Sequence, residues 1–291
     1  MSELSRNLLE PLEVVFVVDG SPDNCGDLLA ASLAKASLRA QLILHSRNFG
    51  SFAAIRTGLA AARGSRFAVM AADLQEPPEL IVDFFKILRD EPVDLVCGMR
   101  TTREDPGTSK YAAQLFWWLY RRIVQPEVPP GGIDVFACNG NVRDALLRFV
   151  ESNSSLIGQL FWLGFRRRNV PYDRRARAGT GKSAWTFRKK WSYMMDSIFS
   201  FTNLPINLLI WMGAIGISTS FAMSALVLTG WICGWIEVQG YTPIMLAVFF
   251  STSLNLLAVG IIGNYLWRTF ENTKGRPLAV MMDRRCFNPE E

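Results

Sequence analysis

Two long runs without a charged residue constrain the second half of the chain most strongly. No charged residue lies between Asp196 and Glu237, and none lies between Glu237 and Arg268. Each run supplies the ~20 apolar residues that a helix needs to cross the hydrocarbon core of a membrane. We therefore expect two membrane spans, near Ile206–Trp231 and Thr242–Trp267. Two buried helices of a soluble protein are the alternative, which is disfavoured because both runs are apolar on all faces and nearly adjacent.

The charges around these runs predict an orientation. The connection Cys233–Tyr241 has one acidic and no basic residue, and basic residues stand on both outer sides of the hairpin. Because short loops rich in Lys and Arg stay in the cytoplasm, we expect both chain ends in the cytoplasm and the connection outside. Met1–Pro11 is short and charged and does not read as a signal peptide.

Lys182–Phe201 mixes basic and aromatic residues, which predicts an amphipathic helix in the headgroup layer of a membrane. We accordingly expect a cytoplasmic domain over 1–180, a juxtamembrane segment over 181–204, a two-helix transmembrane hairpin over 205–268 and a cytoplasmic tail over 269–291.

The first hundred residues alternate between strand and helix patterns. Short runs rich in Val, Phe and Ile predict strands, and alanine- and leucine-rich segments between them predict helices. The predicted strands are Glu13–Val18, Gln41–His45, Phe67–Met70 and Asp94–Gly98, and the predicted helices are Asp27–Ser37, Ser51–Ala62 and Glu79–Arg89. This alternation predicts an α/β fold with a doubly wound, mostly parallel sheet. Further on we expect helices at Tyr111–Val124, Asn141–Phe149 and Leu156–Leu163 and a short strand at Val135–Ala137.

The composition narrows the chemistry. Five cysteines are scattered without a C-x-x-C pair, which argues against a zinc site and favours a reducing compartment. The single histidine, His45, excludes chemistry that needs two imidazoles, and we expect it to be a packed strand residue. The net charge of +5 suits anionic phosphates or an anionic membrane surface, but few basic clusters point to nucleic acid. If the chain is an enzyme, its catalysis must rely on carboxylates and arginines, with or without a metal ion.

The segment Ala71–Pro78, A-A-D-L-Q-E-P-P, follows the third predicted strand. The carboxyl ends of parallel strands are where ligands bind in open α/β sheets. Asp73 and Gln75 are two positions apart, so on an extended segment their oxygens point to one side. A hard divalent cation holding a diphosphate would use such ligands. A polar turn between strand and helix is the alternative.

Other predicted strands also end in polar residues. Asp19 follows the first strand and would bind a nucleotide or cap a turn. Asn48 follows the second strand and would bind substrate or cap a helix. Arg100 and Arg103 follow the fourth strand and would hold phosphate or form a solvated surface pair.

Taken together, these strand ends resemble a known family. The motifs V-D-G-S-P-D-N, S-R-N-F-G, A-A-D-L-Q-E-P-P-E-L and G-M-R-T-T-R occur in this order at natural spacing. They are similar to those of the polyprenyl-phosphate glycosyltransferases, which are inverting family-2 enzymes with the GT-A fold, related to dolichol-phosphate mannose synthase. The two C-terminal spans resemble the bacterial membrane-anchored branch. The resemblance covers the chain from about Glu13 onward.

The resemblance implies roles for individual residues. Asp19 would contact the nucleotide, Asp73 and Gln75 would ligate Mg²⁺ or Mn²⁺, and Arg100 and Arg103 would lie near the donor diphosphate or the acceptor phosphate. Asp134, in G-G-I-D-V-F, would orient the acceptor or act as base. The candidates for binding the lipid phosphate are Arg175, Arg177 and Lys182.

Three differences separate this chain from the family pattern. Relatives open with a strand that ends in P-x-Y-N-E, and Met1–Pro11 contains no such motif. Ala71 stands where the usual D-A-D-L-Q has its first acid, and Val18 stands where D-D-G-S has its first acid. The first difference predicts that the family's first strand is absent from the sheet.

The resemblance implies an enzyme of the bacterial inner membrane that transfers a sugar from a nucleotide sugar to a polyprenyl phosphate, with the catalytic domain in the cytoplasm. It also allows a homo-oligomer. A non-catalytic membrane protein that binds a lipid-linked sugar or a partner is the main alternative, motivated by the missing strand. A soluble dinucleotide-binding oxidoreductase is disfavoured because no G-x-G-x-x-G follows a strand.

Overall fold

A computed structural model describes most of the chain. The described residues are 11–73, 75–100, 117–118, 120–129, 132–151, 153–174, 187–234 and 241–288. The chain divides into two compact units. The first combines Met1–Met194 with Arg276–Glu291, and the second is Met195–Gly275.

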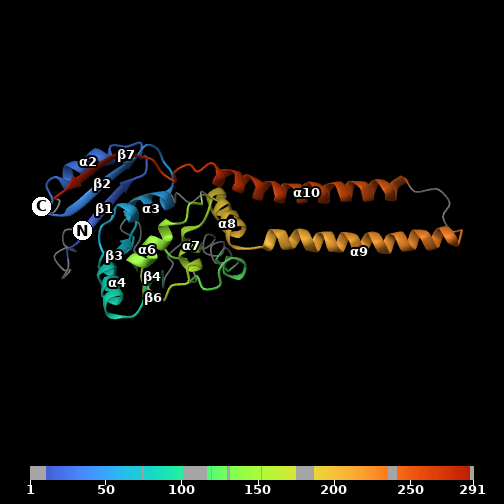
Figure 1. Cartoon of the computed structure of the whole chain (residues 1–291), viewed down its shortest axis with the longest axis horizontal. Helices are drawn as coiled ribbons and strands as arrows, with labels where there is room; N and C mark the ends of the chain where they lie inside the picture. Colours follow the sequence, from blue (N-terminus) through green and yellow to red (C-terminus); the bar gives the residue numbers. More distant parts are fainter. Residues whose placement is uncertain are drawn as a thin grey trace. The chain divides into compact units, whose positions relative to one another are not determined.

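The first sheet of unit one contains three strands in the order β1-β2-β7. These are β1 (Glu13–Val18), β2 (Arg39–His45) and β7 (Met281–Phe287). Strand β1 pairs with β2 in parallel, and β7 pairs with β2 in the antiparallel direction. The end of the chain thus forms an outer strand of this sheet, which the sequence pattern did not predict (Figure 1).

Helices cover both faces of this first sheet. Side chains alternate along β2, so neighbouring residues of this strand face different helices. On one face, Ala40 and Leu42 pack against Ala30 and Leu33 of α2 (Cys25–Leu33). The other face carries the polar side chains of β2 and meets α3 (Ser51–Ala61).

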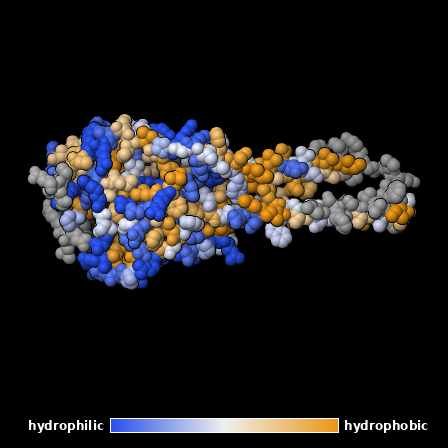
Figure 2. All heavy atoms as spheres, in the orientation of Figure 1, coloured by the Kyte–Doolittle hydropathy of each residue, from blue (hydrophilic) through white to orange (hydrophobic). Residues whose placement is uncertain are grey.

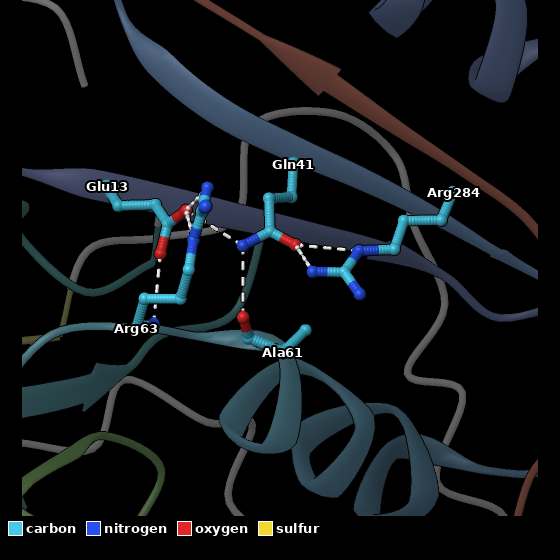
Figure 3. Close-up of polar contacts among 5 residues, drawn as sticks. All are labelled: Glu13, Gln41, Ala61, Arg63 and Arg284. Atoms are coloured by element: carbon cyan, nitrogen blue, oxygen red, sulfur yellow. Dashed lines mark hydrogen bonds and ion pairs between the residues drawn. The ribbon is translucent and has the colours of Figure 1, made fainter. Parts of the chain in front are cut away.

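A polar network holds β7 and α3 to this sheet (Figure 3). Gln41 is fully buried; its Nε2 donates to Glu13 and to the carbonyl of Ala61, and its Oε1 accepts two hydrogen bonds from Arg284. Glu13 in turn accepts hydrogen bonds from the backbone and the guanidinium of Arg63. Although burial alone would raise the pKa of Glu13, these hydrogen bonds leave it below its usual value. Every polar group of the buried Gln41 amide is therefore used.

The second sheet contains four strands in the order β3-β5-β4-β6. Their bounds are Arg66–Val69 for β3, Leu95–Arg100 for β4, Phe136–Asn139 for β5 and Arg167–Tyr172 for β6. Helix α4 (Glu79–Asp90) buries Leu80, Ile81 and Phe84 against it, and the core continues through residues of β4, β5 and β6. This core places the ends of β3, β4 and β6 close together.

The predicted mostly parallel sheet is wrong in two respects. Strand β5 is antiparallel to both β3 and β4, and only β1–β2 and β4–β6 pair in parallel among the described strands. Strands β1 and β3 are also edge strands of separate sheets, with no described strand between them. The α/β class itself is confirmed.

Side chains of two arginines connect the two halves of unit one. Arg56 of α3 donates to the carbonyl oxygens of Leu146, Leu147 and Phe149 and to Oε1 of Gln159. These carbonyls belong to the end of α6 (Gly140–Leu147) and the residues after it, so the cation satisfies groups that a helix end leaves unpaired.

Arg143 of α6 makes a second connection. Its guanidinium lies 4.4 Å from the ring centre of Phe67 in β3 and donates to the carbonyl of Ala62, just after α3. Together with Arg56, it places α6 between the two sheets. Helix α7 (Leu156–Trp162) follows α6 and supplies Gln159.

Unit two consists of long helices. Helix α8 (Phe187–Phe201) begins in unit one, and α9 (Leu204–Ile232) and α10 (Tyr241–Thr273) follow. Large apolar side chains of α9 and α10 are exposed, and Figure 2 shows hydrophobic atoms along these helices. Arg268 of α10 donates to Asp196 of α8 and lies over the ring of Phe199.

The helices α9 and α10 match the two predicted spans in position. In the described part of the chain, however, no single helix is long and apolar enough to cross a membrane. One bent pair, residues 193–201 with residues 204–216, meets these criteria together, with a bend of 74° between its two halves. This finding does not support the predicted two crossings.

We predict that Arg56→Met lowers the free energy of unfolding by about 2–3 kcal/mol, because hydrogen bonds from a charged donor to buried acceptors are among the strongest in proteins. Urea titration of the detergent-solubilised protein measures the change. Arg148→Met is the matched control, since Arg148 is exposed at the end of α6. Equal stability of the two variants would contradict the role of Arg56.

Candidate functional site

The carboxylate of Asp19, just after β1, organises the turn that follows β2. Its oxygens accept hydrogen bonds from the backbone N–H groups of Phe49 and Gly50, each at 2.8 Å, and Nδ1 of His45 lies 2.8 Å from Oδ1. His45 also contacts Thr57 of α3 through Nε2 at 3.0 Å and is buried, as predicted. Asp19 therefore does act as a turn cap, and its contact with a nucleotide stays a prediction.

The loops after β1 and β2 meet closely. Gly20 has a φ of +59°, and a Cβ there would lie 2.1 Å from the carbonyl carbon of Arg47, so glycine is required. Asn48 is exposed and does not cap α3, whose N-cap residue is Gly50 without a side-chain cap. The helix-cap alternative for Asn48 is thus wrong, and its contact with substrate stays a prediction.

Beyond β3 the chain turns through Asp73 and Gln75 into α4. The backbone N–H of Gln75 donates to Oδ1 of Asp73 at 3.3 Å, and both residues are half-buried. Pro78 is the N-cap residue of α4. The two oxygen-bearing side chains therefore belong to one turn at the carboxyl end of β3.

Arg100 and Asp134 form an ion pair at the neighbouring strand ends. Nε and Nη2 of Arg100, the last residue of β4, both contact Oδ2 of Asp134. The hydroxyl of Tyr172, the last residue of β6, donates to the same oxygen at 3.4 Å. Burial is the largest single influence and lowers the pKa of Arg100, but the charge and hydrogen bond of Asp134 together with Tyr172 outweigh it and leave the pKa above its usual value. Burial, followed by the charges of Asp134 and Glu76, raises the pKa of Tyr172, so its phenol stays a donor.

Glu76 is a further acidic residue of this site, and it is fully buried. Its Oε1 lies 3.3 Å from Nε of Arg174, two residues beyond β6. Burial is the main cause that raises the pKa of Glu76; Arg174 lowers it, and the charges of Asp134 and Asp73 raise it further. Charges that act on one another in this way lie close together. The turn after β3 and the ends of β4 and β6 therefore form one cluster.

The cluster unites some of the predicted residues. Asp73, Gln75, Arg100 and Asp134 all lie at this edge of the second sheet, whereas Asp19 and Asn48 lie beyond the ends of β1 and β2. The remaining predicted residues, Arg103, Arg175, Arg177 and Lys182, lie outside the described residues.

Three residues of the cluster were not predicted from the sequence. Glu76 directly follows Gln75 in the D-L-Q-E motif, and its acidic side chain was a usable signal. Tyr172 and Arg174 lie around the end of β6, a strand that R-R-N-V-P-Y does not predict because it alternates poorly and contains proline.

The oxygen atoms of the Asp73 and Gln75 side chains could supply some, but not all, of the ligands of a hard divalent cation. Within the described residues, no three His, Cys, Asp or Glu side chains lie close enough to hold a metal ion by themselves. Mg²⁺ commonly takes one or two carboxylates and completes its coordination with water and substrate phosphates. The Asp73–Gln75 turn, with the charges of Glu76 and Asp134 nearby, has the oxygen donors for such a site.

Comparison with known proteins identifies the family. The model of glycosyl transferase family 2 matches residues 2–148. The chain belongs to this family, and it is a glycosyltransferase. An uncharacterised glycosyltransferase of Synechocystis is 30% identical over 97% of this chain and 91% of its own length. The putative glycosyltransferase CsbB of Bacillus subtilis is 31% identical over 98% of this chain and 86% of its own length.

Another relative carries a more specific name. The prophage bactoprenol glucosyl transferase homolog of Escherichia coli is 27% identical to this glycosyltransferase over 93% of this chain and 88% of its own length.

We predict that Gly98→Ala lowers transfer activity at least about tenfold, because an error of about 1 Å in the position of a reacting group has large effects on rate. A Cβ at Gly98 would lie 2.4 Å from Cγ1 of Val135 and 3.0 Å from the ring of Tyr172, which displaces Tyr172 or Asp134. Gly140→Ala is the control, since a Cβ there meets no atom within 4 Å. Full activity of Gly98→Ala would show that the spacing of these strands does not matter.

Proposed function

We propose that this glycosyltransferase moves a sugar from a nucleotide-sugar donor to a polyprenyl phosphate at the cytoplasmic face of the bacterial inner membrane. The observation that carries the proposal is the cluster of Asp73, Asp134 and Arg100 at one sheet edge of a family-2 chain. Relatives named bactoprenol glucosyl transferases support the acceptor, because bactoprenol is a polyprenol and they align over nearly the whole chain.

The chemistry suits this set of residues. A lipid phosphate is already an anionic nucleophile, so its oxygen attacks the anomeric carbon with little need for deprotonation. The bond from that carbon to the donor diphosphate breaks, the nucleoside diphosphate leaves with the bonding electrons, and the configuration inverts. The protein must align the two phosphates and neutralise the charge of the leaving group. Arg100 provides fixed positive charge, and Asp134 and Tyr172 fix its direction.

Asp73 and Gln75 would hold Mg²⁺ or Mn²⁺, which supplies charge neutralisation for the donor diphosphate when bound. Asp134 orients Arg100. In the proposed reaction it has one further role, which is either to orient the acceptor phosphate or to accept a proton from it. Asp19 and Asn48 would contact the nucleotide, and the predicted phosphate contacts of the remaining basic residues belong to the same proposal.

The apolar helices support a membrane location. Large exposed side chains on α9 and α10 would otherwise face water. They include Ile210, Trp211, Ile215, Leu226, Ile244, Phe250, Leu256, Val259, Ile262 and Leu266. A continuous apolar surface of this kind needs a partner of low polarity. A membrane location is also consistent with the proposed acceptor, because a polyprenyl phosphate is itself held in the membrane by its hydrophobic chain.

The strand β7 bears on the orientation. It follows α10 and is hydrogen-bonded to β2 of the catalytic sheet. In the proposed topology the segment after the hairpin would therefore lie on the same side of the membrane as the catalytic domain. This supports a hairpin with both ends in the cytoplasm, independently of the charges of its flanks.

We predict that Asp73→Asn lowers the rate of sugar transfer at least about 100-fold, since it removes a charged ligand of the donor complex. The assay gives the purified protein in detergent undecaprenyl phosphate, Mg²⁺ or Mn²⁺ and a panel of radiolabelled nucleotide sugars. Asp83→Asn is the matched control, because Asp83 is exposed on α4. A labelled lipid that EDTA abolishes is the expected product.

The same assay separates the enzyme from the non-catalytic alternative. The separation of β1 and β3 into two sheets is the observation that favours the alternative. Absence of a labelled lipid with every donor, in a protein that circular dichroism shows to be folded, would contradict the proposed enzyme.

We predict that replacing residues 205–268 by a Gly/Ser linker of about 15 residues releases the protein from bacterial membranes. The full chain should remain in the membrane pellet after a carbonate wash, and the variant should move to the supernatant. Retention of the variant in the washed pellet would show that the hairpin is not the anchor.

A further inference from the structure

The ion pair between Glu76 and Arg174 spans the whole active edge of the second sheet. Glu76 belongs to the turn after β3, and Arg174 follows β6 by two residues. Strands β3 and β6 are the two outer strands of this sheet. The pair therefore crosses the ends of β5 and β4, where Asp134 and Arg100 lie.

This pair is poorly suited to a purely stabilising role. Glu76 is 0% exposed, and among the side chains that the structure describes its contact with Nε of Arg174 lacks the geometry of a hydrogen bond. Two charges that approach at 3.3 Å without a hydrogen bond recover little of what their burial costs. Hydrophobic residues would pack more favourably here. A functional requirement explains why the charges are at this position.

Arg174 is the more accessible partner of the pair. Its side chain is 27% exposed, whereas that of Glu76 is 0% exposed. Among the described residues, Glu76 is its sole polar partner. The guanidinium therefore has N–H groups left for an anion that enters beside Arg100. Arg100 is the register partner of Tyr172 across the β4–β6 pair, and Arg174 follows Tyr172 by two residues, so both cations belong to the same end of these paired strands.

We propose that Glu76 is a positioning residue for sugar transfer, which holds the Arg174 guanidinium beside Arg100 so that it contacts a substrate phosphate. This inference rests on the proposed function. The phosphate belongs either to the donor diphosphate or to the acceptor lipid, and both present the same chemistry to a guanidinium. Glu76 acts through Arg174 and touches no reacting atom.

The test is a comparison of steady-state constants for Glu76→Gln and the wild-type chain, with the KM of each substrate measured separately. We expect the KM of the substrate whose phosphate binds at Arg174 to rise about tenfold and kcat to change less than about threefold, because a binding contact is lost and the chemistry is not. A rise for the nucleotide sugar assigns the donor, and a rise for the lipid assigns the acceptor.

A double-mutant cycle separates positioning from structure. Arg174→Gln should show the same rise in KM, and Glu76→Gln in the Arg174→Gln background should add less than about twofold, since residues that act as one unit are not additive. Additive effects, or a fall in kcat with both KM values unchanged, would overturn the proposal. Glu91→Gln, an exposed change at the other end of α4, is the control.

Two further measurements cover other outcomes. If Glu76→Gln does not fold, Arg174→Lys keeps the charge for Glu76 but loses the guanidinium fork, and it should give the same rise in KM.

If the wild-type chain transfers no sugar, the proposed function fails, and calorimetry with inorganic pyrophosphate and farnesyl phosphate then tests the pair alone. Weaker binding of one probe to the Glu76→Gln variant, or to Arg174→Lys where the former does not fold, supports the proposal. Equal binding, or no binding to the wild-type chain, overturns it.

Discussion

The guanidinium of Arg56 is the contact on which the rest of the catalytic unit depends. The two sheets share no hydrogen-bonded strand pair among the described strands, so the backbone alone does not connect them. Arg56 reaches from α3, on the first sheet, to the carbonyls at the end of α6, on the second. A half-buried cation with several carbonyl partners is a strong and directional connection. It fixes the distance between the loops after β1 and β2 and the charged cluster beyond β3, β4 and β6.

The cluster itself follows from the electrostatics of one sheet edge. Three carboxylates, those of Asp73, Glu76 and Asp134, are balanced in part by Arg100 and Arg174. In the proposed reaction such a site would accept further positive charge at the Asp73 turn and phosphate at the arginines. Sugar transfer from one phosphate group to another requires this charge pattern. The two anionic phosphates repel each other, and a cation at each of them offsets that repulsion.

The sequence predicted the local elements well and their assembly less well. The apolar runs at β1, β2, β3 and β4 predicted the strands, because short apolar runs that end in turn residues are typical of strands. Strand β5 was expected, but its antiparallel pairing between β3 and β4 was not, since pairing depends on contacts far apart in the chain. Strand β7 was missed because M-M-D-R-R-C-F has three charges and reads as a tail.

The candidate site shows the same division. Asp73, Gln75, Arg100 and Asp134 were found from their positions in motifs, which local sequence contains. Glu76 directly follows Gln75 in the sequence and could have been predicted. Its partner Arg174 is about a hundred positions away, and no local sequence pattern predicts that the two side chains are in contact. The turn-capping role of Asp19 likewise depends on backbone N–H groups of a loop that follows a different strand.

The most direct test of this account is hydrogen–deuterium exchange of the full chain in detergent, with and without a nucleoside diphosphate and Mg²⁺. The account predicts slower exchange in the turn 71–76, at the end of β4 and around Asp134, with little change along α9 and α10. Slower exchange confined to other parts of the chain, or no change at saturating nucleotide, would contradict the assignment of the substrate site to this sheet edge.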